Sequence, residues 1–459
     1  MTLQQSAITG EEPDARIPLS TNLAMLCLFD KGETDGAFGP RHLVILGWRL
    51  TGPLDLAALQ GALDDAVARH EILRTVIVRD DGEPYQKVHP PRSPRLEVVT
   101  LAADESRPRD VVVDEFINGV EASTMSVNEL PHLRAVIGRF DDKDAVLTLI
   151  THHIASDGWS LHVLLRDIAA FYAARRGFGE PGLPPARQYG DYARWQQKDL
   201  ADPSADLKRA YWREKLKGVE ITDIRADRRL TPQTTAVYSV YRFVIGEELT
   251  AGTLNLARTM RSSPFMVLLS AFNVLIHKMT GITDLVSSTI TSGRVDPSFN
   301  DTIGPFFNLV PLRTDLSDCR NFMELVRRTR ATCLEAYANE LPFGDIAAQA
   351  PDLTNTYTRD NGAVCAFQLL QNPAMTEPEV VGDMQYAEVR ERYLSCAETS
   401  DIPNGVLWGM DMMSNGKIGG TMRFNSKQFD EATMVRMVDD YRRILASGVA
   451  DPQRPLSAL

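Results

Sequence analysis

The residues with the clearest chemical potential lie in one short segment, THHIASDGWS, at positions 151–160. The chain has eight histidines, and two of them, His152 and His153, are adjacent here, with Asp157 four residues further on. An imidazole can take a proton near neutral pH, and a nearby carboxylate can orient it. The segment therefore predicts a site of proton transfer, although each histidine taken alone is more often a hydrogen-bonded structural residue.

Strand geometry separates the two histidines. Residues 144–154, DAVLTLITHHI, have the pattern of a β-strand, in which successive side chains point to opposite faces. His152 then shares a face with Ile150, whereas His153 shares the more polar face with Thr151. We therefore expect His153 to face a solvated channel and the chemistry, and His152 to pack.

Asp157 has two interpretations that the residues leave open. It directly precedes a helix predicted over Trp159–Arg176, and an aspartate there is a good N-cap because its side chain accepts free backbone N–H groups. In the cluster, the same carboxylate could help to hold His153 where it takes a proton. Geometry has to decide between an organising and a catalytic function.

The elements that must position this segment alternate between strands and helices. Apolar residues at helical spacing predict a capped helix over Pro53–His70, and Ser263 and Gly281 bracket a second helix. Asn415 and Gly416 between two extended runs predict a β-hairpin. Further strands are expected at residues 73–78, 238–245, 285–291 and 309–314, and further helices at 321–339 and 430–446. The expected fold class is α/β, with helices layered on sheets.

The length of 459 residues suits two lobes. Gly, Pro and polar residues gather near Pro181–Pro185 and at Asp202–Ser204, on either side of a short helical piece. We therefore expect a first lobe over residues 1–180, a bridge over 181–210 and a second lobe over 211–459. Both lobes mix strands and helices in a loosely similar order, which is compatible with a related pair.

Composition and charge narrow the class of protein. A net charge of −12 disfavours broad nucleic-acid binding, which needs a basic face. The amino terminus lacks a basic region followed by an apolar run, and no apolar stretch approaches the length needed to cross a bilayer. We therefore expect a cytoplasmic protein without membrane contact. The five cysteines are scattered and odd in number, so neither a disulfide framework nor a metal site is expected.

The spacing HHxxxDG, present at residues 152–158, resembles the signature of the condensation domains of nonribosomal peptide synthetases. Three more segments resemble motifs of this family in the same order: RHEILRT at 69–75, YGDYARW at 189–195 and IGPFFNLVPLR at 303–313. The closing stretch FNSKQFDEATMVRMVDDYRRIL is similar to the family's last strand exit and helix. The resemblance covers nearly the whole chain.

This resemblance implies two chloramphenicol-acetyltransferase-like lobes in a V-shaped pseudo-dimer, with the active site on a tunnel between them. An acyl group would arrive as a thioester on the phosphopantetheine of a carrier protein, with no bound cofactor, and a nucleophile would enter from the other side. By the same resemblance His153 acts as general base or positions the nucleophile. Asp157 is then structural and ion-paired to an arginine, for which Arg294 is the candidate.

Other residues are assigned to the same site. The backbone N–H of Gly158 is expected to contact the oxyanion, because glycine allows close approach. His152 is expected to pack at the site, and Asn308 and Ser156 to line the tunnel. An acidic carrier protein needs a basic surface on which to dock. A run of arginines on one helix could supply it, although such a run is more often just a solvent-exposed face. The candidates on a predicted helix are Arg327, Arg328 and Arg330.

Two features favour a free-standing enzyme that meets its carrier in trans. The sequence starts with methionine and ends at RPLSAL, without an adenylation loop or a carrier attachment site. The opening STNLAMLCLFD and Gly344 depart from the family pattern, which disfavours peptide-bond formation between two tethered aminoacyl groups. We therefore expect a small-molecule acceptor, an alcohol or an amine, and an ester or amide product. Free-standing members similar to this chain in enediyne antibiotic pathways include ester-forming enzymes.

Other classes remain open at this point. An epimerisation domain shares HHxxxDG, and a catalytically inactive condensation-like domain could serve as a docking platform for a partner enzyme. A heterocyclisation domain would carry DxxxxD in place of the histidines, and a plant-type coenzyme-A-dependent acyltransferase would carry DFGWG; neither is present. The intact His153 and Asp157 argue against the docking platform.

Overall fold

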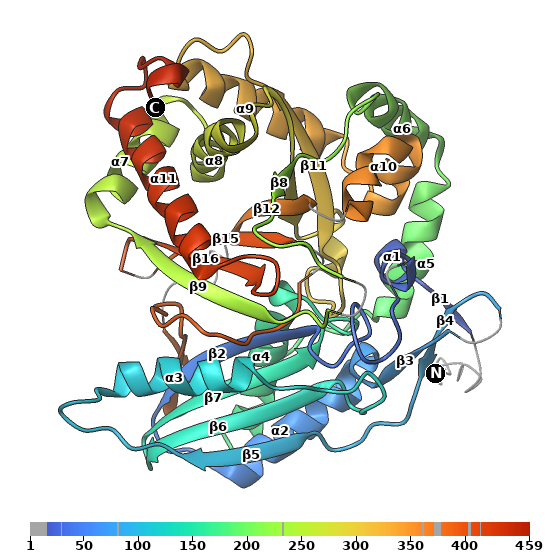
Figure 1. Cartoon of the computed structure of the whole chain (residues 1–459). Coiled ribbons are helices and arrows are strands. Elements are labelled where there is room, and N and C mark those ends of the chain that lie inside the picture. The colour runs from blue at the N-terminus through green and yellow to red at the C-terminus, as the bar shows by residue number, and fades with distance from the viewer. Residues whose placement is uncertain are drawn as a thin grey trace, which may run out of the picture.

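The structure, a computed structural model of the chain, has two lobes that face each other (Figure 1). It describes residues 16–28, 30–79, 82–231, 234–359, 362–370, 378–402, 405–413 and 415–459. Its helices are α1 Thr21–Leu28, α2 Leu56–Arg69, α3 Arg109–Glu121, α4 Gly158–Arg175, α5 Tyr189–Leu200, α6 Pro203–Lys215, α7 Glu247–Thr259, α8 Pro264–Thr280, α9 Phe322–Ala338, α10 Phe343–Gln349 and α11 Glu431–Ala450. Its strands are β1 Ile17–Pro18, β2 Leu43–Thr51, β3 Thr75–Val78, β4 Tyr85–Val88, β5 Arg95–Thr100, β6 Leu133–Asp141, β7 Asp144–His152, β8 Asp223–Arg225, β9 Tyr238–Ile245, β10 Asp284–Thr291, β11 Asn308–Asp315, β12 Gly362–Leu370, β13 Glu379–Val381, β14 Met384–Glu388, β15 Val406–Met412 and β16 Ile418–Asn425.

The first lobe is built on a six-stranded sheet with the order β13-β14-β2-β7-β6-β5. All neighbours are antiparallel except β5 and β6. Helices α2 and α4 pack together over one face, and α3 covers the other (Figure 1). Leu147 and Leu149 of β7 point toward α2 and α4, whereas Ile150 packs with Val120 of α3. Strand β7 is therefore buried on both faces and holds its last residue, His152, rigidly.

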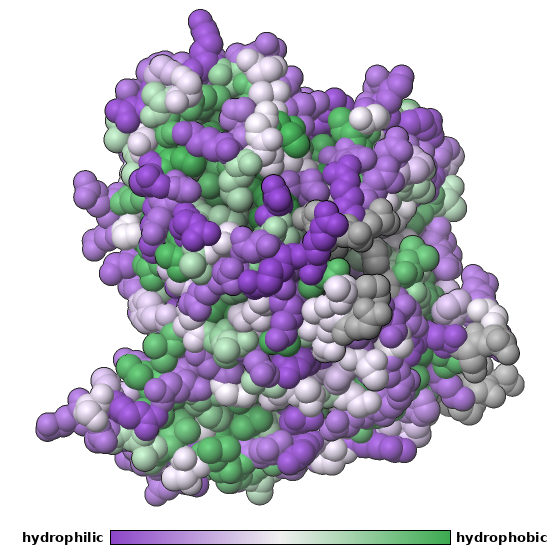
Figure 2. All heavy atoms as spheres, in the orientation of Figure 1, coloured by the Kyte–Doolittle hydropathy of each residue, from purple (hydrophilic) through white to green (hydrophobic). Residues whose placement is uncertain are grey.

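Hydrophilic side chains cover most of the face shown in Figure 2. Hydrophobic ones are visible over part of the first lobe in the same view. Two of the exposed hydrophobic residues are Val98 and Val99 of β5, which are 48% and 44% exposed. Strand β5 ends the sheet in the described part of the chain. It carries Arg95 and Glu97, and charges on an edge strand oppose pairing with another chain.

Local sequence signals set the ends of several elements as predicted. The Asp55 carboxylate accepts the N–H groups of Ala57 and Ala58 at 2.9 and 3.0 Å and starts α2. Ser263 caps α8, and Gly281 ends it with a φ of 75°, a left-handed conformation that glycine adopts without strain. The predicted hairpin is confirmed, because β15 and β16 pair antiparallel over their length.

The second lobe has a five-stranded sheet, β8-β12-β15-β16-β9, with the two-stranded ribbon of β10 and β11 beside it. Helices α7, α8, α9 and α11 pack on this lobe (Figure 1). Helix α8 is buried from Met266 to Ile276 and is the centre of the core. No single helix in the described part of the chain is long and apolar enough to cross a membrane; α7 and α8 reach that threshold only together, across a bend of 109°.

A segment from the far end of the chain completes the first-lobe sheet. Strand β14 pairs antiparallel with β2, with Gln385 opposite Thr51 and Glu388 opposite Trp48. Strand β13 adds to the outer side of β14. The predicted division at residues 180 and 210 assigns residues 379–388 to the second lobe, whereas β13 and β14 belong to the sheet of the first lobe. The reason is that β-pairing can join segments that are remote in sequence.

A buried charged cluster joins α3 of the first lobe to β9 of the second. Glu121 on α3 accepts hydrogen bonds from Arg242 of β9 at 3.0 and 3.2 Å and from Arg392 at 2.5 Å. Burial opposes ionisation of Glu121, but the charges of Arg392 and Arg242 outweigh it and lower the pKa of the carboxyl to about 2. A buried charge without such partners would be costly. The cluster therefore fixes α3 relative to β9.

Candidate active site

The HHxxxDG segment forms a tight turn between β7 and α4. Asp157 is the N-cap residue of α4, as predicted: its Oδ1 accepts the backbone N–H of Ser160 at 2.8 Å and the hydroxyl of the same residue at 2.7 Å. These contacts satisfy backbone groups at the start of the helix. The cap holds the turn that presents His153.

The other oxygen of Asp157 makes an ion pair with Arg294, also as predicted. Arg294 Nη1 lies 2.9 Å from Asp157 Oδ2, and the backbone N–H of Phe306 donates to the same oxygen at 3.0 Å. The two side chains are 6% and 1% exposed, so the pair is buried. Arg294 also donates to Ser160 Oγ at 3.1 Å and to the carbonyl of Thr302 at 2.9 Å. Asp157 thus couples α4 to the segments on either side of Phe306.

His153 is held with one ring nitrogen bound and the other available. Its Nδ1 lies 2.8 Å from the carbonyl oxygen of Ser156. A carbonyl only accepts, so we assign the proton of the neutral ring to Nδ1 and the lone pair to Nε2. Nε2 has no hydrogen-bond partner among the described residues. The ring lies between His42 and Phe307, with centroid distances of 4.8 and 4.6 Å.

Burial keeps His153 neutral. Desolvation lowers the pKa of the imidazole below its ordinary 6.5, and the hydrogen bond to Ser156 and the charge of Asp157 offset this only in part. The positive charge of Arg423 lowers the pKa further. At neutral pH the ring is therefore unprotonated and can accept a proton at Nε2.

The lowered pKa of His153 predicts the acidic limb of the pH–rate profile. If His153 is the base, as the resemblance implies, protonation of Nε2 removes it. Because the pKa lies below 6.5, kcat/KM should then stay level from neutral pH down to about 6.5 and fall at lower pH. The residual rate of His153→Ala should lack this limb. A limb centred above pH 6.5 would show that another group titrates.

His42 belongs to this site and was not anticipated from the sequence. Strand pairing places it beside the turn: Leu43 is opposite His152, and the backbone N–H of His153 donates to the His42 carbonyl at 2.8 Å. Its Nδ1 lies 2.8 Å from the carbonyl of Ala37. Burial, followed by the proximity of the other two histidines, holds the pKa of His42 well below its ordinary range. A lone histidine carries no local signal, so only the pairing of β2 with β7 reveals it.

The prediction of which face of β7 is solvated was wrong. Thr151 and Leu149 are 0% exposed and lie on the face that α2 and α4 cover. The Thr151 hydroxyl bonds to that of Ser156, so its polarity is satisfied inside the protein. His153 contacts the other lobe's segment at Phe307 because β7 ends one residue earlier, and strand alternation does not extend into the turn. His152 packs as predicted, at 0% exposure.

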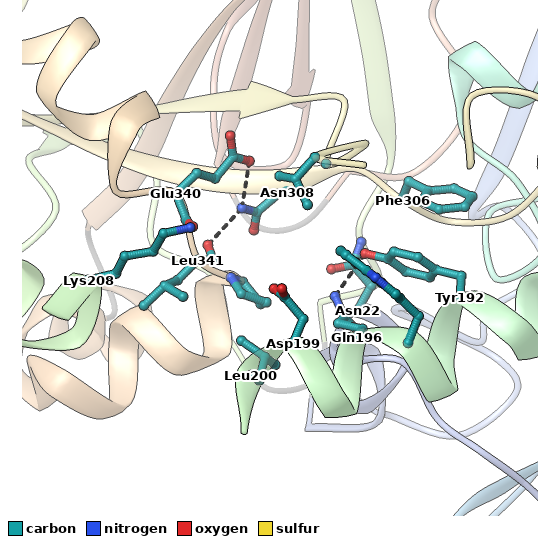
Figure 3. Close-up of a pocket in the computed structure, with 14 residues that line it drawn as sticks. Asn22, Tyr192, Gln196, Asp199, Leu200, Lys208, Phe306, Asn308, Glu340 and Leu341 are labelled. Carbon is teal, nitrogen blue, oxygen red and sulfur yellow. Dashed lines mark hydrogen bonds between the residues drawn. The ribbon is translucent and has the colours of Figure 1, made fainter. Parts of the chain in front are cut away.

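The two residues predicted to line a tunnel differ in their environment. Ser156 is 0% exposed, so its side chain lines no open space, and its carbonyl instead orients His153. Asn308 lies in the wall of a pocket between α1, α5, α6 and β11 (Figure 3). Its Nδ2 donates to Glu340 Oε1 at 3.0 Å and to the carbonyl of Leu341 at 2.8 Å. Asn308 therefore organises a pocket wall.

The three arginines considered as a carrier dock lie on α9 with different surroundings. Arg327 is exposed, whereas Arg330 donates to the carbonyl of Arg261 at 2.7 Å and Arg328 lies 3.4 Å from the carbonyl of Asp315. Arg330 thereby supports a residue with a φ of 49°. At least one of the three arginines therefore has a structural role, and docking of a carrier protein at α9 stays a prediction.

Two facing lobes with helices layered on their sheets form the chloramphenicol-acetyltransferase-like architecture that the motifs implied, and solved structures confirm it. The X-domain from teicoplanin biosynthesis has this fold with a TM-score of 0.80 and 24% identity, over 99% of both chains. The chain belongs to the condensation-domain family: the family model described as Condensation domain matches residues 44–459.

Relatives place the family in nonribosomal peptide synthesis. One of the polypeptides of the linear gramicidin synthase of Brevibacillus parabrevis is 30% identical over 421 residues, 90% of this chain and 8% of that protein. Phosphinothricin tripeptide synthetase PhsC of Streptomyces viridochromogenes is 28% identical over 472 residues, 100% of this chain and 42% of that protein. The chain thus spans less than half of either relative.

A solved structure matches over almost the whole chain. SgcC5 of Streptomyces globisporus, in complex with (R)-(-)-1-(2-naphthyl)-1,2-ethanediol and sucrose, has a TM-score of 0.92 and 41% identity, over 95% of this chain and 100% of that chain. Family membership supports acyl transfer in natural-product biosynthesis as the general activity.

Proposed function

We propose that this protein joins an acyl group, carried as a thioester on the phosphopantetheine of a carrier protein, to a small-molecule alcohol or amine. The observation that carries the proposal is His153, a neutral imidazole with Nδ1 bound to the Ser156 carbonyl and Nε2 available. A base must reach the proton that it removes, and this geometry leaves the required nitrogen open. Membership of the condensation-domain family supports this class of donor.

Atoms balance in a single addition and elimination. The acceptor oxygen or nitrogen forms a bond to the thioester carbon while His153 Nε2 takes its proton, and the carbonyl electron pair moves to the oxygen. The tetrahedral intermediate then collapses, the C–S bond breaks, and the thiolate leaves with the proton from His153. Asp157 touches neither reactant; it positions the turn and offsets part of the charge that the imidazolium gains.

An alcohol acceptor fits the site better than an amine. A hydroxyl needs deprotonation as it attacks, whereas a neutral amine attacks with its own lone pair, so an available Nε2 is more valuable to an alcohol. The similar SgcC5 structure holds a vicinal diol. We therefore expect an ester as the product.

The test is mass spectrometry of the purified protein with an acyl-loaded carrier protein and a mixed panel of alcohols and amines. A new ester or amide that is formed by the wild type and not by His153→Ala supports the proposal. Retention of the carrier-bound thioester with every acceptor, while the carrier still binds, would overturn it and favour a docking function.

Gly158 offers a test of how close the substrate comes to α4. It is the exposed first residue of the helix, and its N–H has no hydrogen-bond partner among the described residues. A Cβ at this position would meet no atom within 4 Å. Gly158→Ala should therefore keep its melting temperature but lower kcat/KM by about 10- to 100-fold, because the methyl group displaces the reacting carbonyl from the N–H.

Gly119→Ala is the matched control for that variant. Gly119 lies on α3, and a Cβ there also meets no atom within 4 Å, so its replacement should leave both melting temperature and kcat/KM close to those of the wild type. Equal activity of the two glycine variants would show that the substrate does not approach the start of α4.

A further inference from the structure

Arg423 lies on the face of β16 that is turned toward the first lobe. Its sequence neighbours Met422 and Phe424 belong to the second-lobe core. Side chains alternate along a strand, so Arg423 and Thr421 share the opposite face. Thr421 pairs with Arg242 of β9, whose guanidinium reaches α3. Arg423 therefore projects toward the space between the lobes.

Arg423 lies close enough to the buried charged cluster for its charge to lower the pKa of Glu121, but it makes no ion pair there with any described residue. It has neither a hydrogen bond nor an ion pair within the described residues, although its side chain is half-buried and its Nε is fully buried. By contrast, Arg242 and Arg392 pair with Glu121, and Arg392 also pairs with Asp114. Among the described residues, three guanidinium groups thus accompany the carboxylates of Glu121 and Asp114, which leaves one positive charge without an ion pair.

The unpaired charge lies close enough to the general base to affect it. Burial is the main cause of the lowered pKa of His153, and Arg423 adds to the effect. The other titratable groups that face this imidazole are His42, His152 and Asp157, and of these only Asp157 carries a negative charge. A partly desolvated cation without a counter-ion is unfavourable. An anion that binds between the lobes would remove this penalty.

We propose that Arg423 binds a negatively charged oxygen of the reacting groups and is a further catalytic residue of this site. The proposal rests on the proposed function. That oxygen is either the oxyanion that forms on the thioester carbonyl or a carboxylate that a substrate already carries. A guanidinium suits both, since it stays charged and offers several donors in a fixed plane.

The same contact relieves a conflict at His153. An imidazolium forms as the base takes the acceptor proton, and a bare arginine nearby opposes that charge. When an oxyanion forms in the same step, it lies against the guanidinium and neutralises it, so the positive charge on His153 is no longer opposed. Arg423 therefore favours the intermediate over the ground state, which is the condition for a rate effect.

Kinetics of Arg423→Gln and Arg423→Lys test the proposal. We expect Arg423→Gln to lower kcat/KM by about 10²- to 10³-fold, as loss of an oxyanion donor does, with an unchanged or higher melting temperature because the removed charge has no partner. Arg423→Lys should recover part of the rate. A fall in kcat with every acceptor indicates the oxyanion, and a rise in KM confined to carboxylate-bearing substrates indicates the carboxylate. Arg443→Gln, an exposed arginine of α11, should match the wild type; equal rates for Arg423→Gln and the wild type would overturn the proposal.

A measurement without turnover separates this inference from the proposed function. The imidazole pKa of His153, followed by NMR, should rise when sodium acetate replaces sodium chloride at constant ionic strength, because acetate pairs with Arg423. In Arg423→Gln the pKa should start higher and not respond to acetate. If the wild type transfers no acyl group, the proposed function fails and this measurement decides alone: no acetate effect in the wild type would overturn the anion site.

Discussion

His153→Ala should lower kcat/KM for an alcohol acceptor by about 10²- to 10⁴-fold, the range that general-base catalysis typically supplies. The variant removes the one ring nitrogen at this turn that can take the acceptor proton, while the ion pair of Asp157 with Arg294 stays in place. With an amine acceptor the loss should be smaller. Steady-state kinetics of both acceptors with one acyl-loaded carrier measure the difference.

His89→Ala is a suitable control, because His89 contacts the fold through its backbone and lies outside the turn. It removes an imidazole of the same size and should leave both rates unchanged. Small and equal losses for the alcohol and the amine in His153→Ala would refute the base assignment. The site would then act by bringing reactants together.

Asp157→Ala should be the most destabilising substitution at the site, by about 3–5 kcal/mol, the usual cost of breaking a buried ion pair from one side. It leaves the guanidinium of Arg294, 1% exposed, without its carboxylate, and it frees the backbone N–H of Ser160. The N–H of Phe306 keeps only its contact with the Gly304 carbonyl at 3.1 Å. Activity should fall with stability, since the turn that holds His153 loses its cap. Equilibrium unfolding in guanidinium chloride measures the change in the free energy of unfolding.

A double-mutant cycle separates the pair from the cap. If the unpaired cation causes the loss, Asp157→Ala should cost much less in an Arg294→Met background than alone. The surface pair of Asp440 with Arg443 is the control, and Asp440→Ala should change the unfolding free energy by less than about 1 kcal/mol. A stable, fully active Asp157→Ala protein would contradict the structural role of the carboxylate.

Features that depend on neighbouring residues were predictable from the sequence. Asp55 and Ser263 cap their helices, Gly281 ends α8, and Asp157 caps α4, because each contact spans only a few positions. The hairpin of β15 and β16 follows from its turn residues for the same reason. The pair of Asp157 with Arg294 is not local, and it was found through the resemblance to a family.

Features that depend on pairing between remote segments were missed. His42 reaches His153 only through the register of β2 with β7, and Arg423 faces the same site only because β16 lies beside β9. Residue polarity also led to a wrong prediction. The polar side chain of Thr151 indicated that its face of β7 is solvated, yet the hydroxyl is hydrogen-bonded to that of Ser156 inside the protein. A single sequence gives residue type and spacing, but neither register nor the partner of a buried polar group.

The strand that crosses from the second half of the chain has a consequence for biosynthesis on the ribosome. When the ribosome has added His152, strands β2, β5, β6 and β7 have all been translated. The strand that pairs with the outer edge of β2 is β14, which is complete only after Glu388 has been added. At about 5–20 residues per second this interval is roughly 12–47 s. During this interval the outer edge of β2, a strand of nine residues, exposes backbone groups that β14 will later pair in part, and an open edge can recruit other strands. Nascent chains stalled between residues 152 and 388 should therefore be more prone to associate with each other than chains stalled beyond 388.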